Sequence, residues 1–192
     1  MTNNKDDFSK SINKELKGTK TEKNLLEAFC GESMARNKYT FFASQAKKEG
    51  YEQISRIFEE TANNEKEHAK IWFKLLNKGK INATKENLEE AAKGESYEWE
   101  TMYANFAKDA KEEGFDDIAY LFETIRHIEK MHMTRYKKLI EDLMKDMIFQ
   151  KSEKIMWECA NCGYTFEGEK APEICPFCKH PKAYFYEKCY NY

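Results

Sequence analysis

The chain has 192 residues and a formal net charge of −2, with 34% charged and 14% aromatic residues. This length allows one ordinary domain and a small additional module. The nearly balanced charge gives no electrostatic reason to expect nucleic acid or an anionic membrane as a partner. No apolar run approaches the ~20 residues that span a bilayer, and the initial segment MTNNKDDFSK lacks the apolar core of a signal peptide. We therefore expect a cytoplasmic protein whose six cysteines are reduced and available to bind metal.

An internal repeat organises most of the chain. The segment Gly31–Ser33 recurs as Gly94–Ser96, and the segment Glu65–His68 recurs, with one residue changed, as Glu129–His132. Each copy has the pattern of a helix, a glycine turn and a second helix. The repeat therefore predicts two helical hairpins in succession.

The two glycine turns define the hairpins. Gly50 and Gly114 lie where the C-terminus of a helix favours a residue with positive φ. The apolar periodicity then predicts four helices, over roughly 21–49, 51–78, 85–113 and 115–148. We expect them to form an all-α four-helix bundle over residues 1–150.

The third predicted helix contains one residue more than its counterpart. Glu32 and Glu95 are 63 positions apart, whereas Tyr39 and Tyr103 are 64 apart. A helix accommodates one additional residue most simply as a π-bulge, which is frequent at functional sites. We predict such a bulge near Glu98–Met102.

Carboxylates and histidines interrupt the apolar stripes of the predicted helices. Burying several carboxylates together is unfavourable unless cations neutralise them. One Glu-x-x-His segment alone is usually a solvated helix face, but two at matching repeat positions, with glutamates on the other helices, match the di-iron carboxylate bundle pattern. Oxygen ligands with few nitrogens and no sulfur favour iron or manganese over copper or zinc. The predicted ligands of two irons are Glu32, Glu65, His68, Glu95, Glu98, Glu129 and His132.

Aromatic residues accompany the predicted ligands. Tyr39 and Tyr103 each lie two turns beyond a glutamate of the site. Their hydroxyls could bind the glutamates and deliver protons or electrons, or the rings could simply fill the core. Trp72 and Trp99 are interpreted as packing residues, and Cys30 as a small core residue.

The sequence changes character from about Lys154, where Cys, Pro, Gly and aromatic residues become frequent. Two Cys-x-x-Cys segments, separated by twelve residues, form a strong metal-binding signature. Four thiolates can bind zinc or a single iron, and their spacing does not distinguish the two metals. We expect a module with short strands over residues 154–192, after a polar linker near Phe149–Lys154. Its predicted metal ligands are Cys159, Cys162, Cys175 and Cys178.

Several of these segments resemble the rubrerythrin family. The bundle motifs of that family are similar to Gly31–Asn37, Asn64–Lys70, Gly94–Trp99 and Glu129–His132, and its C-terminal rubredoxin-like module is similar to Cys-Ala-Asn-Cys-Gly-Tyr and Ile-Cys-Pro-Phe-Cys. The resemblance covers about residues 20–190. It implies a ferritin-like di-iron bundle followed by a rubredoxin-like domain that holds iron rather than zinc.

The resemblance also implies an activity and partners. The family reduces hydrogen peroxide to water as a non-haem di-iron peroxidase, which makes Glu98, Tyr39 and Tyr103 the expected catalytic residues. Bridging roles are implied for Glu65 and Glu98. The implied electron donor is an external NAD(P)H-dependent reductase of the rubredoxin type, or rubredoxin itself. Homodimers are implied, in which the tail of one subunit faces the bundle of the other.

The resemblance assigns further ligand roles. It implies that Glu32, Glu65, Glu98 and Glu129 are ligands of the di-iron pair and that His132 binds one of the irons, whereas Glu95 and His68 exchange as one iron changes its oxidation state.

Two departures from the family pattern carry further expectations. Lys179 follows Cys178 where such knuckles usually have glycine, so we expect a strained positive φ. The connection from about Lys78 to Thr84 is short, which favours exchange of a hairpin between chains.

Two alternative functions use the same residues. A ferroxidase or iron-handling protein could be built on the same bundle but would have no need of the four-cysteine tail. An electron carrier or a zinc-stabilised binding module would need the tail but not the carboxylates.

Overall fold

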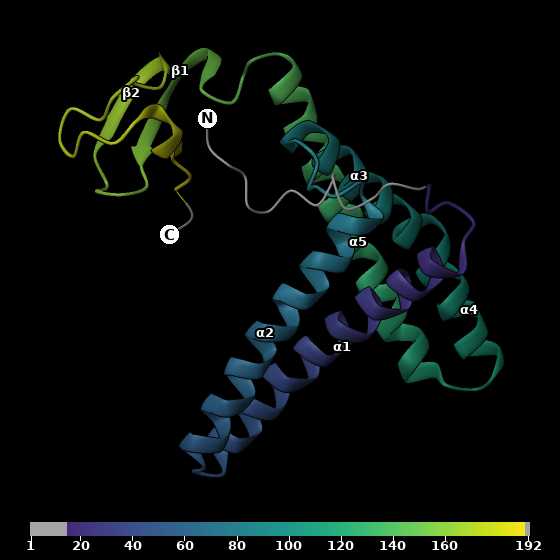
Figure 1. Ribbon diagram of the computed structural model, residues 1–192. Helices are drawn as coiled ribbons and strands as arrows, with labels where there is room; N and C mark the ends of the chain where they lie inside the picture. Colours follow the sequence, from purple (N-terminus) through teal and green to yellow (C-terminus); the bar gives the residue numbers. More distant parts are fainter. Residues whose placement is uncertain (1–14, 191–192) are drawn as a thin grey trace. The chain divides into compact units, whose positions relative to one another are not determined.

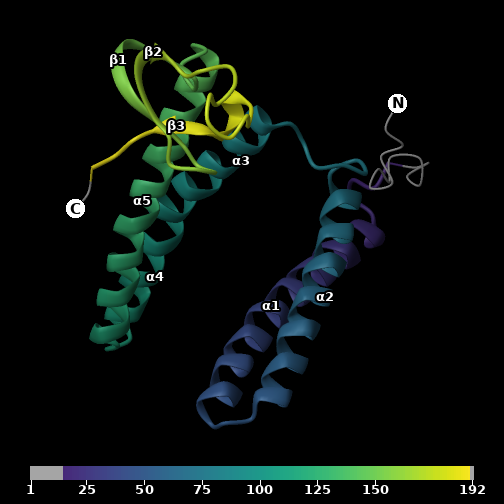
Figure 2. The same ribbon diagram turned by 90° about the vertical axis from the view of Figure 1, so that its left-hand side faces the viewer.

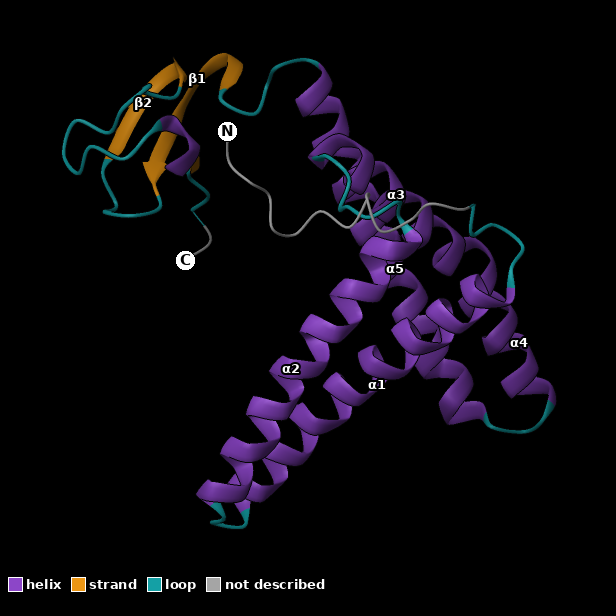
Figure 3. Cartoon of the chain, viewed as in Figure 1, coloured by secondary structure: helices purple, strands orange, loops and turns teal. Residues whose placement is uncertain are grey.

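The computed structural model describes residues 15–190. The initial segment MTNNKDDFSK, which was expected not to be a signal peptide, lies outside the described residues. The chain divides into two compact units, residues 1–82 and 83–192, which are described separately. Helices account for the first unit and much of the second, and strands occur near the C-terminus (Figure 3). Within the described residues, no helix combines the length and apolar character needed to cross a bilayer.

The first unit is a hairpin of two long helices, α1 (Lys20–Lys48) and α2 (Glu52–Leu76), which lie side by side (Figures 1 and 2). Thr19 caps α1, because its hydroxyl accepts a 3.1 Å hydrogen bond from the N–H of Glu22. Gly50 turns the chain between the helices with a φ of +85°, which confirms the predicted turn.

The second unit begins with the other hairpin. Its first helix is continuous from α3 (Thr84–Tyr97) through the π-helical segment η2 (Glu98–Met102) to α4 (Tyr103–Glu112). The predicted π-bulge is therefore confirmed at the expected residues. Its second helix is α5 (Asp116–Met144), and Gly114 makes the turn before it with a φ of +84°.

Helix α5 ends earlier than predicted. Asp146 adopts a left-handed φ of +56°, and the N–H of Met147 donates to the carbonyl of Asp142 at 2.7 Å. These features end the helix after Met144 instead of near residue 148.

Each hairpin packs one tyrosine and two phenylalanines between its helices, at equivalent positions of the repeat. The ring centroids of Phe42 and Phe58 lie 5.6 Å apart, as do those of Phe106 and Phe122. The tyrosines that complete these two aromatic triads are Tyr39 and Tyr103. The repeat in the sequence is therefore also a repeat of packing.

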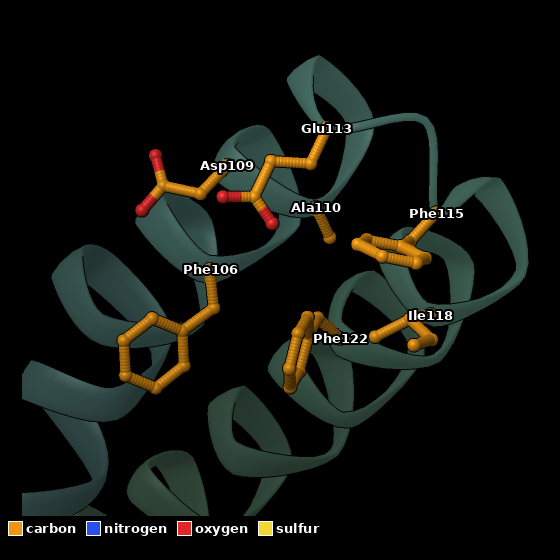
Figure 4. Close-up of a pocket in the computed structure, with 7 residues that line it drawn as sticks. All are labelled: Phe106, Asp109, Ala110, Glu113, Phe115, Ile118 and Phe122. Atoms are coloured by element: carbon orange, nitrogen blue, oxygen red, sulfur yellow. The ribbon is translucent and has the colours of Figure 1, made fainter.

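The apolar face of each hairpin extends beyond what two helices can cover. Phe42 and Ile54 in the first hairpin are each 46% exposed, and Ile118 in the second is 44% exposed. Figure 4 shows a shallow apolar pocket on the second hairpin, near its glycine turn, lined by Phe106, Asp109, Ala110, Glu113, Phe115, Ile118 and Phe122. A stable domain buries such a face against a further layer.

The C-terminal module is a three-stranded antiparallel sheet in the order β2-β1-β3. Its strands are β1 (Gln150–Cys159), β2 (Thr165–Lys170) and β3 (Phe185–Glu187), with a 3-10 turn, η3 (Lys182–Tyr184), before β3. The prediction of a linker near Phe149–Lys154 is wrong in part, because β1 already begins at Gln150 opposite Lys170.

A small core holds this module together. Trp157 and Cys175 are fully buried, and Cys159 and Phe185 are nearly so. The indole Nε1 of Trp157 donates a 2.9 Å hydrogen bond to the carbonyl of Gly168. Two of the four predicted thiol ligands therefore belong to the core of the module.

Candidate metal centres

The first hairpin brings together three of the predicted ligands. Glu32 projects from α1, whereas Glu65 and His68 project from α2, and their ligand atoms lie within 4.8 Å of one another. The Nδ1 atom of His68 lies 2.8 Å from Oε2 of Glu65 and 3.9 Å from Oε1 of Glu32. Residues three apart on a helix share a face, which places both α2 ligands toward α1. We refer to these three residues as the α1–α2 half-site.

The second hairpin repeats this arrangement. Glu95 from α3 meets Glu129 and His132 from α5, again with their ligand atoms within 4.8 Å. The Nδ1 atom of His132 lies 2.7 Å from Oε2 of Glu129 and 3.6 Å from Oε2 of Glu95. We refer to these residues as the α3–α5 half-site.

The carboxylates of both half-sites are electrostatically strained. The hydrogen bond with Glu65, together with burial and the charge of Glu65, raises the pKa of Glu32. Burial, followed by the hydrogen bond with Glu129, raises the pKa of Glu95. Two carboxylates this close favour an added proton or a bound cation. Each half-site thus has the charge and the oxygen and nitrogen donors that an iron ion requires.

The π-helical segment contributes a further carboxylate. Glu98 is the first residue of η2, and its negative charge raises the pKa of Glu95 and of Tyr103. Burial is the main reason why the pKa of Tyr103 is raised, and Glu98, Glu129 and Glu95 add to it in that order. Tyr103 is therefore held as a neutral phenol beside the carboxylates of the α3–α5 half-site.

Tyr39 occupies the equivalent place in the first hairpin. Its ring lies 6.2 Å from those of Phe42 and Phe58, measured between centroids. This packing agrees with the core-filling interpretation, and a catalytic role for Tyr39 stays a prediction.

The four predicted thiol ligands of the C-terminal module converge. The Sγ atoms of Cys159 and Cys178 are 3.6 Å apart, and those of Cys162 and Cys175 are 3.7 Å apart. All four lie within 4.8 Å of one another. These distances suit one tetrahedral metal ion on four thiolates.

Backbone N–H groups influence the charge of the thiols. The N–H of His180, followed by the neighbouring thiols, lowers the pKa of Cys178 to about 5. The N–H of Tyr164 acts in the same direction on Cys162, but burial and the other thiols outweigh it and raise the pKa of Cys162 to about 12. The N–H of His180 thus favours the thiolate form of Cys178, which is the form that binds a metal ion.

The two knuckles of this cluster have the same backbone but different residues. After the first, Gly163 has a φ of +73°, and after the second, Lys179 has a φ of +63°. The expected positive φ at Lys179 is therefore confirmed. A left-handed conformation costs about 1–2 kcal/mol for a residue with a Cβ atom. The Nζ of Lys179 donates a 2.9 Å hydrogen bond to the carbonyl of Pro176, which ties this side chain to its own knuckle.

Two interpretations of the sequence are revised here. Cys30 is exposed in the hairpin, so the prediction of a small core residue is wrong. Trp72 does more than fill space, because its indole Nε1 is buried and influences the carboxyl of Glu32. The sequence offered one signal for this, namely the position of Trp72 one helical turn after His68 on the same stripe.

The comparisons with known proteins agree with this geometry. The sequence model described as "Rubrerythrin" matches residues 23–140, and the one described as "Rubrerythrin, rubredoxin-like domain" matches residues 157–186. The chain belongs to the rubrerythrin family. Its fold is thus a ferritin-like four-helix domain followed by a rubredoxin-like module. The two half-sites fit the di-iron site of the family, and the four cysteines fit its rubredoxin-like iron site.

Individual relatives are similar along most of their length. Rubrerythrin-1 of Clostridium acetobutylicum is 50% identical, over 93% of this chain and all of the relative. Rubrerythrin of Porphyromonas gingivalis is 50% identical, over 94% of this chain and 96% of the relative. Rubrerythrin of Nitratidesulfovibrio vulgaris is 45% identical, over 90% of this chain and 96% of the relative. The family consists of di-iron proteins of oxidative-stress defence, so this chain is an iron-dependent oxidoreductase.

Proposed function

We propose that this protein is a non-haem di-iron peroxidase that reduces hydrogen peroxide to water, with electrons supplied through its own four-cysteine iron. One observation carries the proposal: the same chain contains two carboxylate–histidine half-sites and a four-thiolate cluster. A site that only stores iron needs the first and not the second. Iron held by these residues would supply the two electrons that, with two protons, convert hydrogen peroxide to two molecules of water.

The ligand roles are those that the resemblance to the family implies. Glu32, Glu65, Glu98, Glu129 and His132 would hold the two irons, with Glu65 and Glu98 as the shared carboxylates. Glu95 and His68 would be alternative ligands of one iron, according to its oxidation state.

Protons come from side chains that the site keeps neutral. Tyr103 retains its phenolic proton because burial and the neighbouring carboxylates raise its pKa. It can donate a hydrogen bond to an oxygen of the substrate or to a ligating glutamate. We assign Tyr39 the equivalent task in the first hairpin, and Glu98 passes protons between ligand and substrate.

The rubredoxin-like module implies redox partners. We propose an external NAD(P)H-dependent reductase of the rubredoxin type, or rubredoxin itself, as the electron donor in the cytoplasm. We further propose a homodimer, in which the four-cysteine module of one chain serves the di-iron site of the other. Exchange of a hairpin between chains stays a prediction.

Separating the two metal sites tests this function. In Cys175→Ser, whose side chain is a predicted iron ligand, turnover of peroxide with a reductase should fall to background. One stoichiometric oxidation of the ferrous protein by peroxide should remain, followed by its optical spectrum. The matched control is Cys189→Ser, which removes an exposed thiol outside the cluster and should keep full turnover.

Two results would contradict the proposal. Unchanged reductase-driven turnover in Cys175→Ser would show that electrons do not pass through the four-cysteine site. Formation of a mineral core with excess ferrous iron, without peroxide reduction, would instead indicate an iron-handling protein.

A further inference from the structure

One buried polar group near the α1–α2 half-site has no role in the function described so far. Trp72 lies on α2, and its indole Nε1 is shielded from solvent without a hydrogen-bond partner among the described residues. Leaving a buried N–H unpaired costs about 1–3 kcal/mol. Buried polar groups in native proteins are seldom left unpaired, so this one requires an explanation.

Trp157 shows what is unusual about this indole. The Nε1 of Trp157 donates to the carbonyl of Gly168 at 2.9 Å and is satisfied within its own module. Trp72 also has a buried indole Nε1, but this donor has no hydrogen-bond partner among the described residues. The surroundings of Trp72 therefore indicate which acceptor it serves.

That acceptor is the carboxylate of Glu32. Glu32 and His68 have ligand atoms within 4.8 Å of each other, and Trp72 follows His68 by one turn of α2. Phe29, one turn before Glu32 on α1, packs against Phe73 with ring centroids 5.7 Å apart, so the turn of α2 that contains Trp72 lies against the turn of α1 that contains Glu32. The indole also opposes the rise in the pKa of Glu32 that Glu65 and burial cause, as a hydrogen-bond donor would. Glu32 in this structure hydrogen-bonds to Glu65. A cation bound between the two carboxylates would remove the need for that hydrogen bond and leave one oxygen of Glu32 available.

The equivalent position of the second hairpin lacks an indole. Trp72 is followed 64 positions later by Tyr136, just as Tyr39 is followed by Tyr103. Glu95, the counterpart of Glu32, is influenced chiefly by burial, by Glu129 and by charges of the site. The two half-sites thus have the same types of ligand. They differ in the residue one turn beyond the histidine, which is Trp72 on α2 and Tyr136 on α5.

We propose that Trp72 is a positioning residue: when a cation occupies the α1–α2 half-site, its Nε1–H donates a hydrogen bond to the carboxylate of Glu32. Ligating carboxylates are commonly held by such outer partners, whose loss typically lowers metal affinity ~10- to ~100-fold. The hydrogen bond fixes Glu32, whereas the position equivalent to Trp72 in the second hairpin holds Tyr136. The proposal depends on metal binding in this half-site and not on which oxidant reacts there.

A diamagnetic metal makes this hydrogen bond observable. The full-length protein, labelled with ¹⁵N at its indoles and with zinc already on the four cysteines, is titrated with further Zn²⁺. The protein contains three tryptophans, so three indole N–H resonances are expected, and Trp72→Phe assigns one of them. The indole proton resonance of Trp72 should shift downfield, and this proton should exchange more slowly with solvent. The resonance of Trp157, whose indole is already hydrogen-bonded, should not shift.

Metal affinity provides the second measurement. Trp72→Phe keeps an aromatic ring but removes the donor, and should weaken binding of the added Zn²⁺ about 10-fold or more. The matched variant is Tyr136→Phe, which removes the polar group at the equivalent position of α5 and should leave that affinity within about 2-fold.

Three results would overturn the proposal. They are an unmoved Trp72 resonance at saturating Zn²⁺, equal affinity of Trp72→Phe and the unmodified protein, and failure of the half-site to bind Zn²⁺ at all. None of them depends on peroxide turnover, so a failure here is distinguishable from a failure of the proposed peroxidase activity.

Discussion

The two helical hairpins show how a repeated sequence can produce two half-sites with different properties. Each places one glutamate opposite a Glu-x-x-His segment and stacks an aromatic triad beyond it. Helix α1 is regular throughout its 29 residues, whereas its counterpart is interrupted by the π-helical segment η2. The second hairpin also has a carboxylate, Glu98, at the start of this segment, where the repeat places Ala35 in the first hairpin. The repeat accounts for the ligands that the two half-sites have in common, and local differences in sequence make the two half-sites unequal.

Removing the additional residue of the second hairpin is the most direct test of this difference between the two hairpins. Deletion of Thr101, which is exposed within η2, should convert the π-helical turn to a regular helix. Glu98 would then rotate relative to Tyr103, and such misplacement typically costs ~100-fold in rate. We expect peroxide turnover to fall about 100-fold or more and the iron content of the bundle to decrease, measured by steady-state kinetics and metal analysis.

The control for this deletion is Thr101→Ala, which keeps the chain length and should retain activity and iron. A deletion variant with full iron content and full turnover would show that the π-helical segment is not needed.

The aromatic triads allow a test of whether the two hairpins are equally stabilised by packing. Phe58 and Phe122 are partly buried at equivalent positions. Replacing a fully buried Phe by Ala costs about 3–5 kcal/mol, so we expect about 2 kcal/mol for either Phe58→Ala or Phe122→Ala. Urea unfolding followed by circular dichroism measures both. Losses that differ more than about twofold would show that the triads are not equivalent in packing.

The end of α5 offers a third comparison, because α5 continues beyond the point at which α2 stops. Asp142 is buried there and forms ion pairs with Lys138 and, at 3.6 Å, with Lys151. The hydrogen bond from Lys138, followed by the charge of Lys151, lowers the pKa of Asp142 below its usual 3.8, against the effect of burial. Asp142→Asn should therefore lower the free energy of unfolding by about 1 kcal/mol near neutral pH.

The pH dependence of that difference follows from the lowered pKa. Stabilisation by Asp142 is complete above the unfolded pKa of 3.8 and is lost as the pH falls through the lower folded value. The unfolding free energies of Asp142→Asn and the unmodified protein should thus differ by a constant amount from about pH 7 to about pH 5, and converge below about pH 4. A difference that grew on acidification would contradict this assignment.

The last comparison concerns a hydrogen bond found in the first hairpin. The hydroxyl of Ser55 is buried and donates to the carbonyl of Ala43 at 2.9 Å, whereas Ala119 stands at the equivalent position of α5. Ser55→Ala should cost about 1 kcal/mol in urea unfolding, because the carbonyl loses its partner. The exposed Ser44→Ala is the control and should be neutral within about 0.5 kcal/mol. A neutral Ser55→Ala would show that the α1–α2 contact does not need this bond.

The features predictable from the sequence were those encoded by short spacings. The change of repeat offset predicted the π-bulge, Glu-x-x-His predicted both half-sites, and paired Cys-x-x-Cys predicted the thiol cluster. The polar character of the segment after Phe149 was misleading, because pairing with β2 was strong enough to make it a strand. Cys30 was misjudged because helical periodicity alone does not show how much of a face a single neighbouring helix covers.

The sequence by itself determined the family, the helices and their glycine turns, and the ligand types, since each depends on residues close together along the chain. Only the tertiary structure decided which carboxylates lie close enough to raise one another's pKa, that the N–H of His180 lowers the pKa of Cys178 and that the indole Nε1 of Trp72 is buried without a partner. These properties depend on distances and burial between residues far apart in sequence, and electrostatic and hydrogen-bond energies change steeply with both.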